Sequence, residues 1–196
     1  IENGKDPRAN LEKSISYFKK VTEMNSTSPY SYNNLSSVTQ SLAEWEYNHG
    51  IDAVPRYNEA LKPAEKALKL AADYPFAHFN AAKILAGLAR IELDHDRSPQ
   101  NYIERSKAML EKGIKIQSNI AGPNDELASV LLIQAESEMT QGKSPEQTIR
   151  KTEPLIERSL NLGATRSAAY VVRGDANVLL ARWLMKNKGD AVSVLE

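Results

Sequence analysis

The sequence predicts an all-α protein in which antiparallel helix pairs stack in series as an α-solenoid. Three observations lead to this prediction. Apolar residues recur at intervals of three and four residues, as in Leu35, Val38, Leu42 and Trp45, and no segment alternates convincingly at a period of two. Turn-forming residues separate the helical patterns at regular distances. The whole pattern repeats every 46 residues, which indicates equivalent units rather than unrelated domains.

The repeat is visible in columns, a column being the set of residues that lie 46 positions apart. One column holds four alanines, and we predict equivalent, mostly buried positions for Ala43, Ala89, Ala135 and Ala181. Other columns are apolar throughout: Leu11, Tyr57, Ile103 and Ile149; Met24, Leu70, Ile116 and Leu162; and Tyr47, Leu93, Met139 and Met185. Two columns hold mainly small residues, as expected where helices approach closely: Ser36, Ala82, Ala128 and Gly174; and Ser14, Ala60, Ser106 and Thr152.

Each period contains a shorter and a longer helical pattern. Capping residues before prolines, as in Ser28-Pro29, and glycines such as Gly50 mark where helices begin and end. Pro63 and Pro154 fall inside shorter patterns, so those helices should kink or begin late. The predicted helices are the shorter 8–24, 56–72, 99–117 and 146–162 and the longer 29–48, 76–95, 123–141 and 166–187.

The pattern predicts one helical-repeat domain over residues 1–196. Its repeats are 3–50, 51–96, 97–142 and 143–190, and residues 191–196 start a truncated helix. Solenoids need a polar capping element, and without one the last long helix should leave apolar residues uncovered among Val178, Leu179, Ala181 and Trp183. We therefore expect the segment Asp190–Leu195 to fold back or to pack on another copy, which makes a homo-oligomer through the C-terminal end a further expectation.

Composition excludes several classes of protein. The chain of 196 residues has 25 basic and 25 acidic residues, so it lacks the surplus positive charge of a generic nucleic-acid or membrane-surface binder. The absence of cysteine excludes disulfides, Cys-ligated zinc and cysteine catalysis. No apolar run approaches the roughly 20 residues that cross a bilayer, so we expect no membrane insertion and a cytoplasmic location. The start Ile1-Glu2-Asn3-Gly4 is neither a signal peptide nor a translation start, which suggests a fragment of a longer protein.

No motif for catalysis is present. The sequence has no phosphate-binding glycine loop, no zinc-protease motif and no kinase catalytic loop, so we expect no enzyme activity, no nucleotide binding and no cofactor in this chain. His49 and His95 fall at helix ends, where a structural role is favoured over metal binding, and we expect no metal site. Acidic pairs such as Glu136 with Glu138 recur in the repeat, which favours a structural surface column over a catalytic pair.

Three segments resemble tetratricopeptide (TPR) repeats: Ser31–Ser36, Glu65–Leu70 and Ala77–Ala82. Their order of aromatic, Asn, Leu and small residues is similar to the first TPR helix, and Lys-Ala-Leu-x-Leu is similar to the end of the second. The period is about a dozen residues longer than the usual 34 or so. The third unit has Asn124 in place of the aromatic residue, and the fourth has Arg173 where leucine is expected.

The longer period has a narrower resemblance, which covers almost the whole chain. Gly4–Pro7, Leu11–Ile15, Tyr32–Leu35, Leu42–Glu46 and Gly50 together are similar to the tandem TPR tail of bacterial serine/threonine protein kinases. This resemblance implies a non-catalytic scaffold for protein–protein interaction, as a regulatory or docking region of a larger signalling protein, for example a kinase of this kind. The alternative is a self-assembly module that oligomerises its parent protein.

In a TPR-like solenoid the longer helices line a concave groove, so the resemblance implies a protein or peptide ligand there. The predicted contact residues are Asn33, Asn34, Ser37, Phe79, Asn80 and Lys83 at a polar end and Val171, Val172 and Asp175 at an apolar end. One cation, Lys83, is too few for the carboxylate clamp of chaperone-binding TPR domains. A helix or an extended peptide with an apolar anchor suits the groove better, and truncating Phe79 should cost about 1–3 kcal/mol of binding without changing the helical content.

Overall fold

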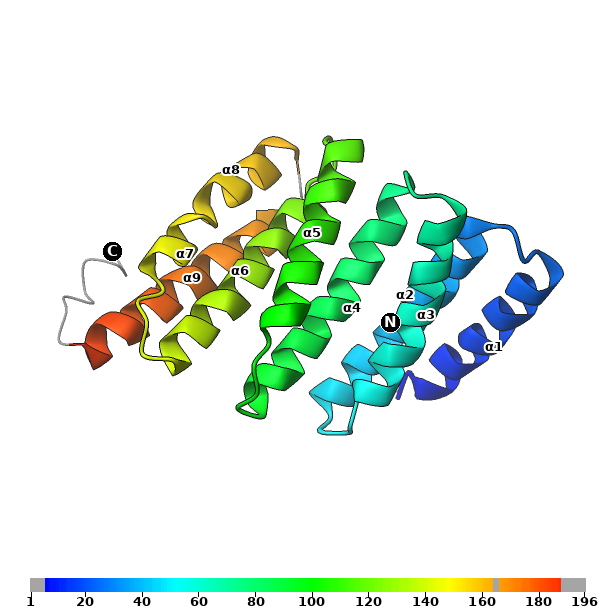
Figure 1. The fold of residues 1–196 in the computed structure, drawn as a ribbon, viewed down its shortest axis with the longest axis horizontal. Coiled ribbons are helices and arrows are strands. Elements are labelled where there is room, and N and C mark those ends of the chain that lie inside the picture. Colours follow the sequence, from blue (N-terminus) through cyan, green and yellow to red (C-terminus); the bar gives the residue numbers. More distant parts are fainter. Residues whose placement is uncertain (1–5, 164–165, 188–196) are drawn as a thin grey trace. The chain divides into compact units, whose positions relative to one another are not determined.

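The computed structural model describes residues 6–163 and 166–187, and every regular element in these ranges is an α-helix, as predicted (Figure 1). The helices are α1 (Arg8–Met24), α2 (Pro29–Asn48), α3 (Val54–Leu70), α4 (Pro75–Asp94), α5 (Gln100–Ile116), α6 (Gly122–Thr140), α7 (Glu146–Arg150), α8 (Glu153–Asn161) and α9 (Arg166–Lys186).

The helix boundaries follow the local signals in the sequence. α1 and α2 have the predicted bounds, and the Ser28 hydroxyl accepts a hydrogen bond from the Ser31 amide (3.3 Å) at the start of α2. Past the ends of α2 and α6, Gly50 and Gly142 have φ angles of 70° and 72°. This left-handed conformation favours glycine and ends a helix efficiently.

The two prolines inside shorter helices have different effects. The fourth shorter helix is interrupted at Lys151–Thr152, and α8 begins at Glu153, directly before Pro154. α3, by contrast, begins at Val54 and continues through Pro63. Of the two predicted outcomes, the late start is found in α8. α3 does not begin late, and a kink at Pro63 stays a prediction.

The chain forms two compact units, Ile1–Leu88 and Ala89–Glu196, with the boundary inside α4. The organisation as one domain over residues 1–196 thus stays a prediction. The alanine column is confirmed, because Ala43, Ala89 and Ala135 are 0% exposed and Ala181 is 5% exposed.

In the first unit, α2 packs on both α1 and α3. Ile15, Leu35 and Leu42 form an apolar core between α1 and α2, and Leu11 and Phe18 cover it in part. α2 approaches α3 closely enough for the Ser36 hydroxyl to donate a hydrogen bond to the Ala60 carbonyl (2.9 Å).

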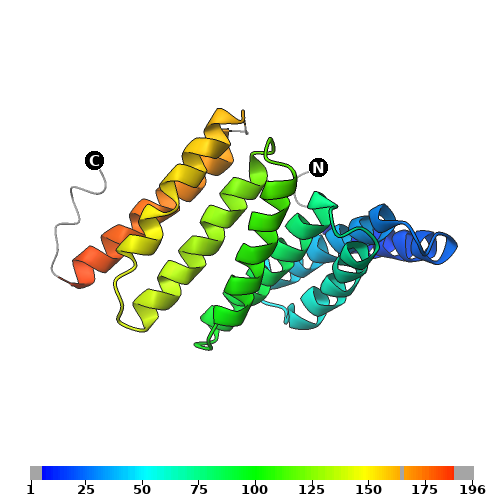
Figure 2. The same ribbon diagram turned by 45° about the horizontal axis from the view of Figure 1, so that its top comes forward.

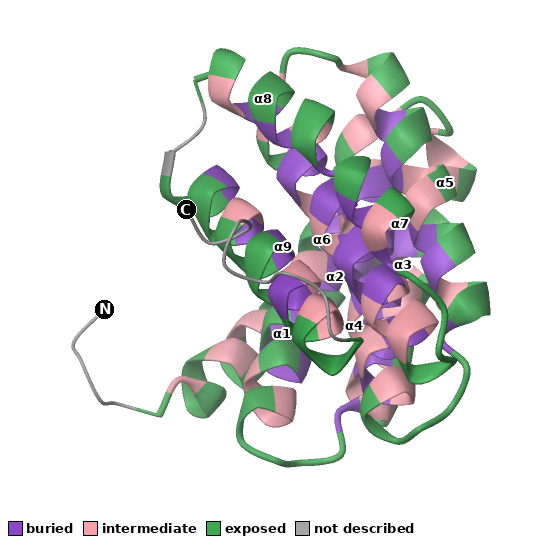
Figure 3. Ribbon diagram, turned by 90° about the vertical axis from the view of Figure 1, so that its left-hand side faces the viewer, coloured by how far each residue is buried: buried purple, intermediate pink, exposed green. Residues whose placement is uncertain are grey.

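In the second unit, α6 is the central helix. α5 and α6 lie side by side (Figure 2), and α6 also packs on α7, α8 and α9. Eleven of the 19 residues of α6 are buried, so it has little surface free for solvent (Figure 3). The core that joins α6 to α7, α8 and α9 contains Ala128, Leu132, Ala135, Ile149, Ile156, Ala169, Val172, Ala176 and Leu179.

The prediction for the last long helix is confirmed for one residue of four. Val178 is 44% exposed, but Leu179 and Ala181 are 5% exposed and Trp183 is half-buried. Leu179 belongs to the core with α6, which explains its burial. The predicted helix start at Asp190–Leu195 lies outside the described residues.

Candidate functional site

Two asparagines connect the long helices α2 and α4 in the first unit. The Asn80 amide nitrogen donates hydrogen bonds to the side-chain oxygen of Asn33 (2.8 Å) and to its backbone carbonyl (3.4 Å). The structure therefore brings together two of the predicted contact residues. Around them Ser37 is half-buried, and Asn34 and Lys83 are exposed.

Phe79 lies differently from the other predicted residues of this unit. It is 6% exposed, and its ring meets that of Phe76 edge to face at 6.0 Å. Truncating Phe79 would therefore remove packing as well as any contact with a ligand. A contact between Phe79 and a ligand stays a prediction.

An aromatic cluster extends from Phe79 and is not among the contact residues predicted from the sequence. Tyr30 meets Tyr74 at 4.9 Å between ring centroids, and Tyr74 meets Phe76 at 5.8 Å. Tyr30 and Phe76 are 62% and 44% exposed. Their spacing of 46 residues was the signal in the sequence, because it places both aromatics in the first turn of a long helix.

α2 and α4 carry the oppositely charged residues Glu44 and Lys83, whose charges interact. Desolvation by the surrounding protein raises the pKa of Glu44, against the opposing effects of the Lys83 charge and a hydrogen bond from Gln40. Glu44 still has more than a third of its surface exposed. The carboxylate is thus accessible but poorly solvated.

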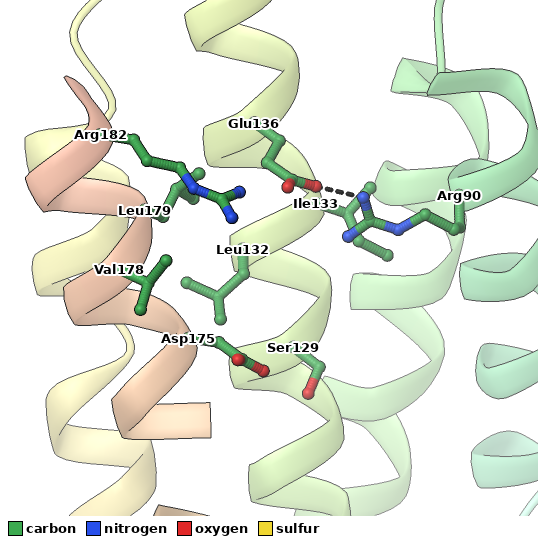
Figure 4. Close-up of a pocket in the computed structure, with 9 residues that line it drawn as sticks. All are labelled: Arg90, Ser129, Leu132, Ile133, Glu136, Asp175, Val178, Leu179 and Arg182. Carbon is green, nitrogen blue, oxygen red and sulfur yellow. Dashed lines mark hydrogen bonds and ion pairs between the residues drawn. The ribbon is translucent and has the colours of Figure 1, made fainter. Parts of the chain in front are cut away.

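The second unit contains a pocket of about 340 Å³ on α6, α9 and the last turns of α4. Figure 4 shows Leu132 and Val178 at its centre, with Ser129 and Asp175 on one side and Arg182 reaching across it from α9. Its lining residues are Arg90, Ser129, Leu132, Ile133, Glu136, Asp175, Val178, Leu179 and Arg182.

Charges of alternating sign occupy one column of the long helices: Glu44, Arg90, Glu136 and Arg182. In the pocket, Arg90 donates a hydrogen bond to the Glu136 carboxylate and pairs with it. Arg182 and Asp175 are exposed and have no hydrogen-bond or ion-pair partner within residues 6–163 and 166–187. The pocket therefore combines an apolar centre with one unpaired cation and one unpaired carboxylate.

The contact residues predicted from the sequence include only part of this pocket. Asp175 lines it, but Val171 is 62% exposed elsewhere on α9, and Val172 is 7% exposed because it packs into the core with α6. Arg90, Glu136 and Arg182 are missing from the predicted set. Their column was readable from the 46-residue spacing, but Glu136 was interpreted only as one of a pair of acidic surface residues. The predicted continuous groove joins residues of both units and stays a prediction.

The histidines are engaged in structural hydrogen bonds. His49 and His95 donate from Nδ1 to the carbonyls of Trp45 and Ile91, both at 2.7 Å, and the buried His78 contacts the Ala72 carbonyl at 2.9 Å. Within the described ranges, no three His, Asp or Glu side chains are grouped so as to hold a metal ion. Nor is any helix there long and apolar enough to cross a membrane.

No protein-family profile and no curated protein sequence matches the chain, but solved structures do. YrrB, a TPR protein with an unusual peptide-binding site, aligns over 90% of this chain and 70% of its own, with a TM-score of 0.54 and 19% identity. TTC0263, a thermophilic TPR protein of Thermus thermophilus, aligns over 95% of this chain and 91% of its own, with a TM-score of 0.59 and 15% identity. At these identities the likeness concerns the fold alone. The chain thus has the all-α, helix-pair fold of TPR proteins.

Proposed function

We propose that the chain is a non-catalytic scaffold that binds a peptide segment of a partner protein, with the pocket of the second unit as the anchor site. The observation that carries this proposal is the combination of the apolar residues Leu132 and Val178 with the unpaired Arg182 in one concavity. A few charged groups around an apolar centre are typical of sites that fix one side chain and orient its neighbours.

The charges define the preferred ligand. Arg182 offers a guanidinium that pairs well with a carboxylate, and Asp175 offers a carboxylate on the other side of the apolar centre. A suitable peptide therefore carries an apolar anchor with an acidic residue on one side and a basic or polar residue on the other. The unusual peptide-binding site for which YrrB is described supports a peptide, without regard to its sequence, as the ligand.

A screen of labelled peptides against the chain tests the proposal. Peptides with an apolar residue beside Asp or Glu should be selected, and their affinity should fall with ionic strength because Arg182 is exposed. Arg182→Glu should weaken binding of a selected peptide by about tenfold or more, as expected for a charge-assisted hydrogen bond. The matched control Lys112→Glu, an exposed charge reversal on α5, should leave the affinity unchanged.

Selected peptides that ignore Arg182→Glu, or that lose affinity equally with Lys112→Glu, would refute this pocket as the anchor. Binding that depends on Asn34 and Lys83 instead would place the site in the first unit, at the polar end of the predicted groove.

The scaffold is proposed to be a regulatory or docking region of a larger signalling protein such as a bacterial serine/threonine kinase. The resemblance to the TPR tails of these kinases supports this assignment. The sequence encoded upstream in the parent gene tests it directly, because a kinase catalytic domain should precede this region.

Self-assembly of the parent protein is a second candidate function. The exposed apolar residues of α9 favour it, since Val178 and Met185 are 44% and 71% exposed.

A further inference from the structure

Four columns of the shorter helices are buried in every repeat except the first. The buried members are Tyr57, Ala60, Ala64 and Ala67 on α3, Ile103, Ser106, Leu110 and Gly113 on α5, and Ile149, Thr152, Ile156 and Ser159 in the α7–α8 segment. On α1 the same columns hold Leu11, Ser14 and Phe18, which are half-buried, and Val21, which is 41% exposed. We call these four residues the α1 face.

Three columns of the longer helices are buried in every repeat except the last. Their buried members are Asn33, Ser36 and Gln40 on α2, Phe79, Ala82 and Ala86 on α4, and Asp125, Ala128 and Leu132 on α6. On α9 the same columns hold Val171, Gly174 and Val178, all exposed, with Val171 at 62% and Val178 at 44%. These three residues form the α9 face.

Within the chain, these two sets of columns pack against each other. In the first unit, Ser36 of the longer helix α2 hydrogen-bonds to the Ala60 carbonyl of the next shorter helix, α3. In the second unit, Ala128 and Leu132 of α6 share a core with Ile149 and Ile156 of the α7–α8 segment that follows. The α9 face and the α1 face are therefore the two halves of an interface that the chain already forms between its own repeats.

We infer that copies of this chain associate head to tail, with the α9 face of one copy packed on the α1 face of the next. Gly174 would then lie against Ser14, as Ser36 lies against Ala60 within the chain. Both faces are mainly apolar among the described residues, so their contact removes exposed hydrophobic surface from water. The occupant is a second copy because the chain itself supplies both halves of the interface.

Such a contact is heterologous, since each copy uses a different surface to bind its two neighbours. A heterologous contact that does not close into a ring adds copies without limit. The expected assembly therefore grows past a dimer, to a ring if the rotation closes and to an open series of oligomers if it does not.

Two charge substitutions block the two faces separately. Ser14→Glu places a carboxylate on the α1 face, and Gly174→Glu places one on the α9 face. Both should fold, because Ser14 is only half-buried and a Cβ atom at Gly174 would meet no atom within 4 Å. Neither Ser14 nor Gly174 lines the proposed peptide pocket, but Val178 of the α9 face does. Peptide affinity is therefore measured on the Ser14→Glu variant, whose α9 face is free, so that failure of this proposal is distinguishable from failure of peptide binding.

Sedimentation over a range of concentrations tests the inference. The mass of the unmodified chain should increase past that of a dimer as its concentration rises. Each variant alone should remain a monomer. An equal mixture should form a dimer and nothing larger, because Ser14→Glu keeps an intact α9 face and Gly174→Glu keeps an intact α1 face. The control Ile116→Glu, on a residue of α5 that is 40% exposed, should associate like the unmodified chain, and circular dichroism checks that all variants fold.

Three results would overturn the inference. A monomer at all concentrations would show that the two faces do not meet. A Ser14→Glu variant that still dimerises alone would indicate contact between two α9 faces. A mixture that stays monomeric would show that the two faces are not complementary.

Discussion

Gly87 and Gly174 lie on long helices but have different surroundings. A Cβ atom at Gly87 would lie 2.4 Å from Cζ of Tyr57, which is 3% exposed, whereas one at Gly174 would meet nothing within 4 Å. The close approach between α3 and α4 therefore requires a glycine at position 87. Gly174 lowers the stability of its helix, and within the isolated chain no close contact requires a glycine there.

The two glycines should therefore respond in opposite directions to alanine. Gly174→Ala should raise the free energy of unfolding by about 0.5–1 kcal/mol, because alanine favours the helix. Gly87→Ala should lower it by about 1–3 kcal/mol, since the Tyr57 ring must move in a packed core. Urea denaturation measures both, and a gain in stability for Gly87→Ala would contradict the close approach.

The carboxyl groups of Glu44 and Glu92 differ in the direction of their pKa shifts. Desolvation raises the pKa of Glu44, so the folded protein binds this proton more readily than the unfolded chain does. A hydrogen bond from the Arg97 side chain, at 2.8 Å, lowers the pKa of Glu92. The two groups therefore make opposite contributions to the dependence of stability on pH.

Comparing glutamine variants over a series from pH 7 down to about pH 3 tests these directions. The Glu44 carboxylate lowers the free energy of unfolding at pH values above its raised pKa, and this loss disappears as the pH falls through that pKa. Glu44→Gln should therefore be at least as stable as the parent at pH 7. It should lose this advantage as the pH falls. The stabilisation by Glu92 is present above its unfolded pKa and is lost as the pH falls through its lowered pKa. Glu92→Gln should accordingly be slightly less stable at pH 7, and the same sign for both variants would show that one shift is misassigned.

At the scale of single helices, proline position decides whether a helix continues. Pro154 occupies the first turn of α8, where its missing amide hydrogen costs little. Pro63 lies inside α3, where the ring removes the hydrogen bond to the carbonyl four residues earlier. Tertiary packing compensates for this loss, because Tyr57, Ala60, Ala64 and Ala67 bury one side of α3 on both sides of the proline.

Replacing each proline by alanine separates these effects. Pro63→Ala should stabilise the protein by about 1–3 kcal/mol, because it restores an internal helix bond. Pro154→Ala should change the stability by less than about 1 kcal/mol, since α8 already begins there. Thermal unfolding gives the comparison, and a larger effect at Pro154 would show that the break between α7 and α8 is under strain.

At the scale of the whole molecule, terminal helices have fewer neighbours than internal ones. The apolar core of α1 consists of contacts with α2, and four apolar side chains of α9 are exposed: Tyr170, Val171, Val178 and Met185. α6, by contrast, packs on four helices of its unit. In a linear array of repeats, helices with one neighbour open at lower free energy than those between two.

Native-state hydrogen exchange should show this gradient. Amides of α1 and α9 should exchange faster than those of α2 and α6, at a protein concentration low enough to avoid association. Equal protection in all helices would indicate that the chain opens only as a single cooperative body.

How much of the protein can be predicted from its sequence depends on the range of the interactions involved. Helix bounds such as 8–24 and 29–48 were predictable because capping residues, prolines and apolar spacing act within a few residues. The buried alanine column was predictable because a repeated sequence repeats its environment. The burial of individual side chains was not, since Phe79, Val172 and Leu179 differ little in sequence context from residues that stay exposed.

The helical character of the chain, its period of 46 residues and the column of alternating charge on its long helices all follow from the amino-acid sequence. Two other features became known only from the packing of the helices. Arg90 pairs with Glu136 while Arg182 has no such partner among the described residues, and α3 continues through Pro63. The difference arises because helix propensity and amphipathic spacing are local properties of the chain, whereas the pairing of a charge and the burial of a side chain depend on which other helix packs beside it.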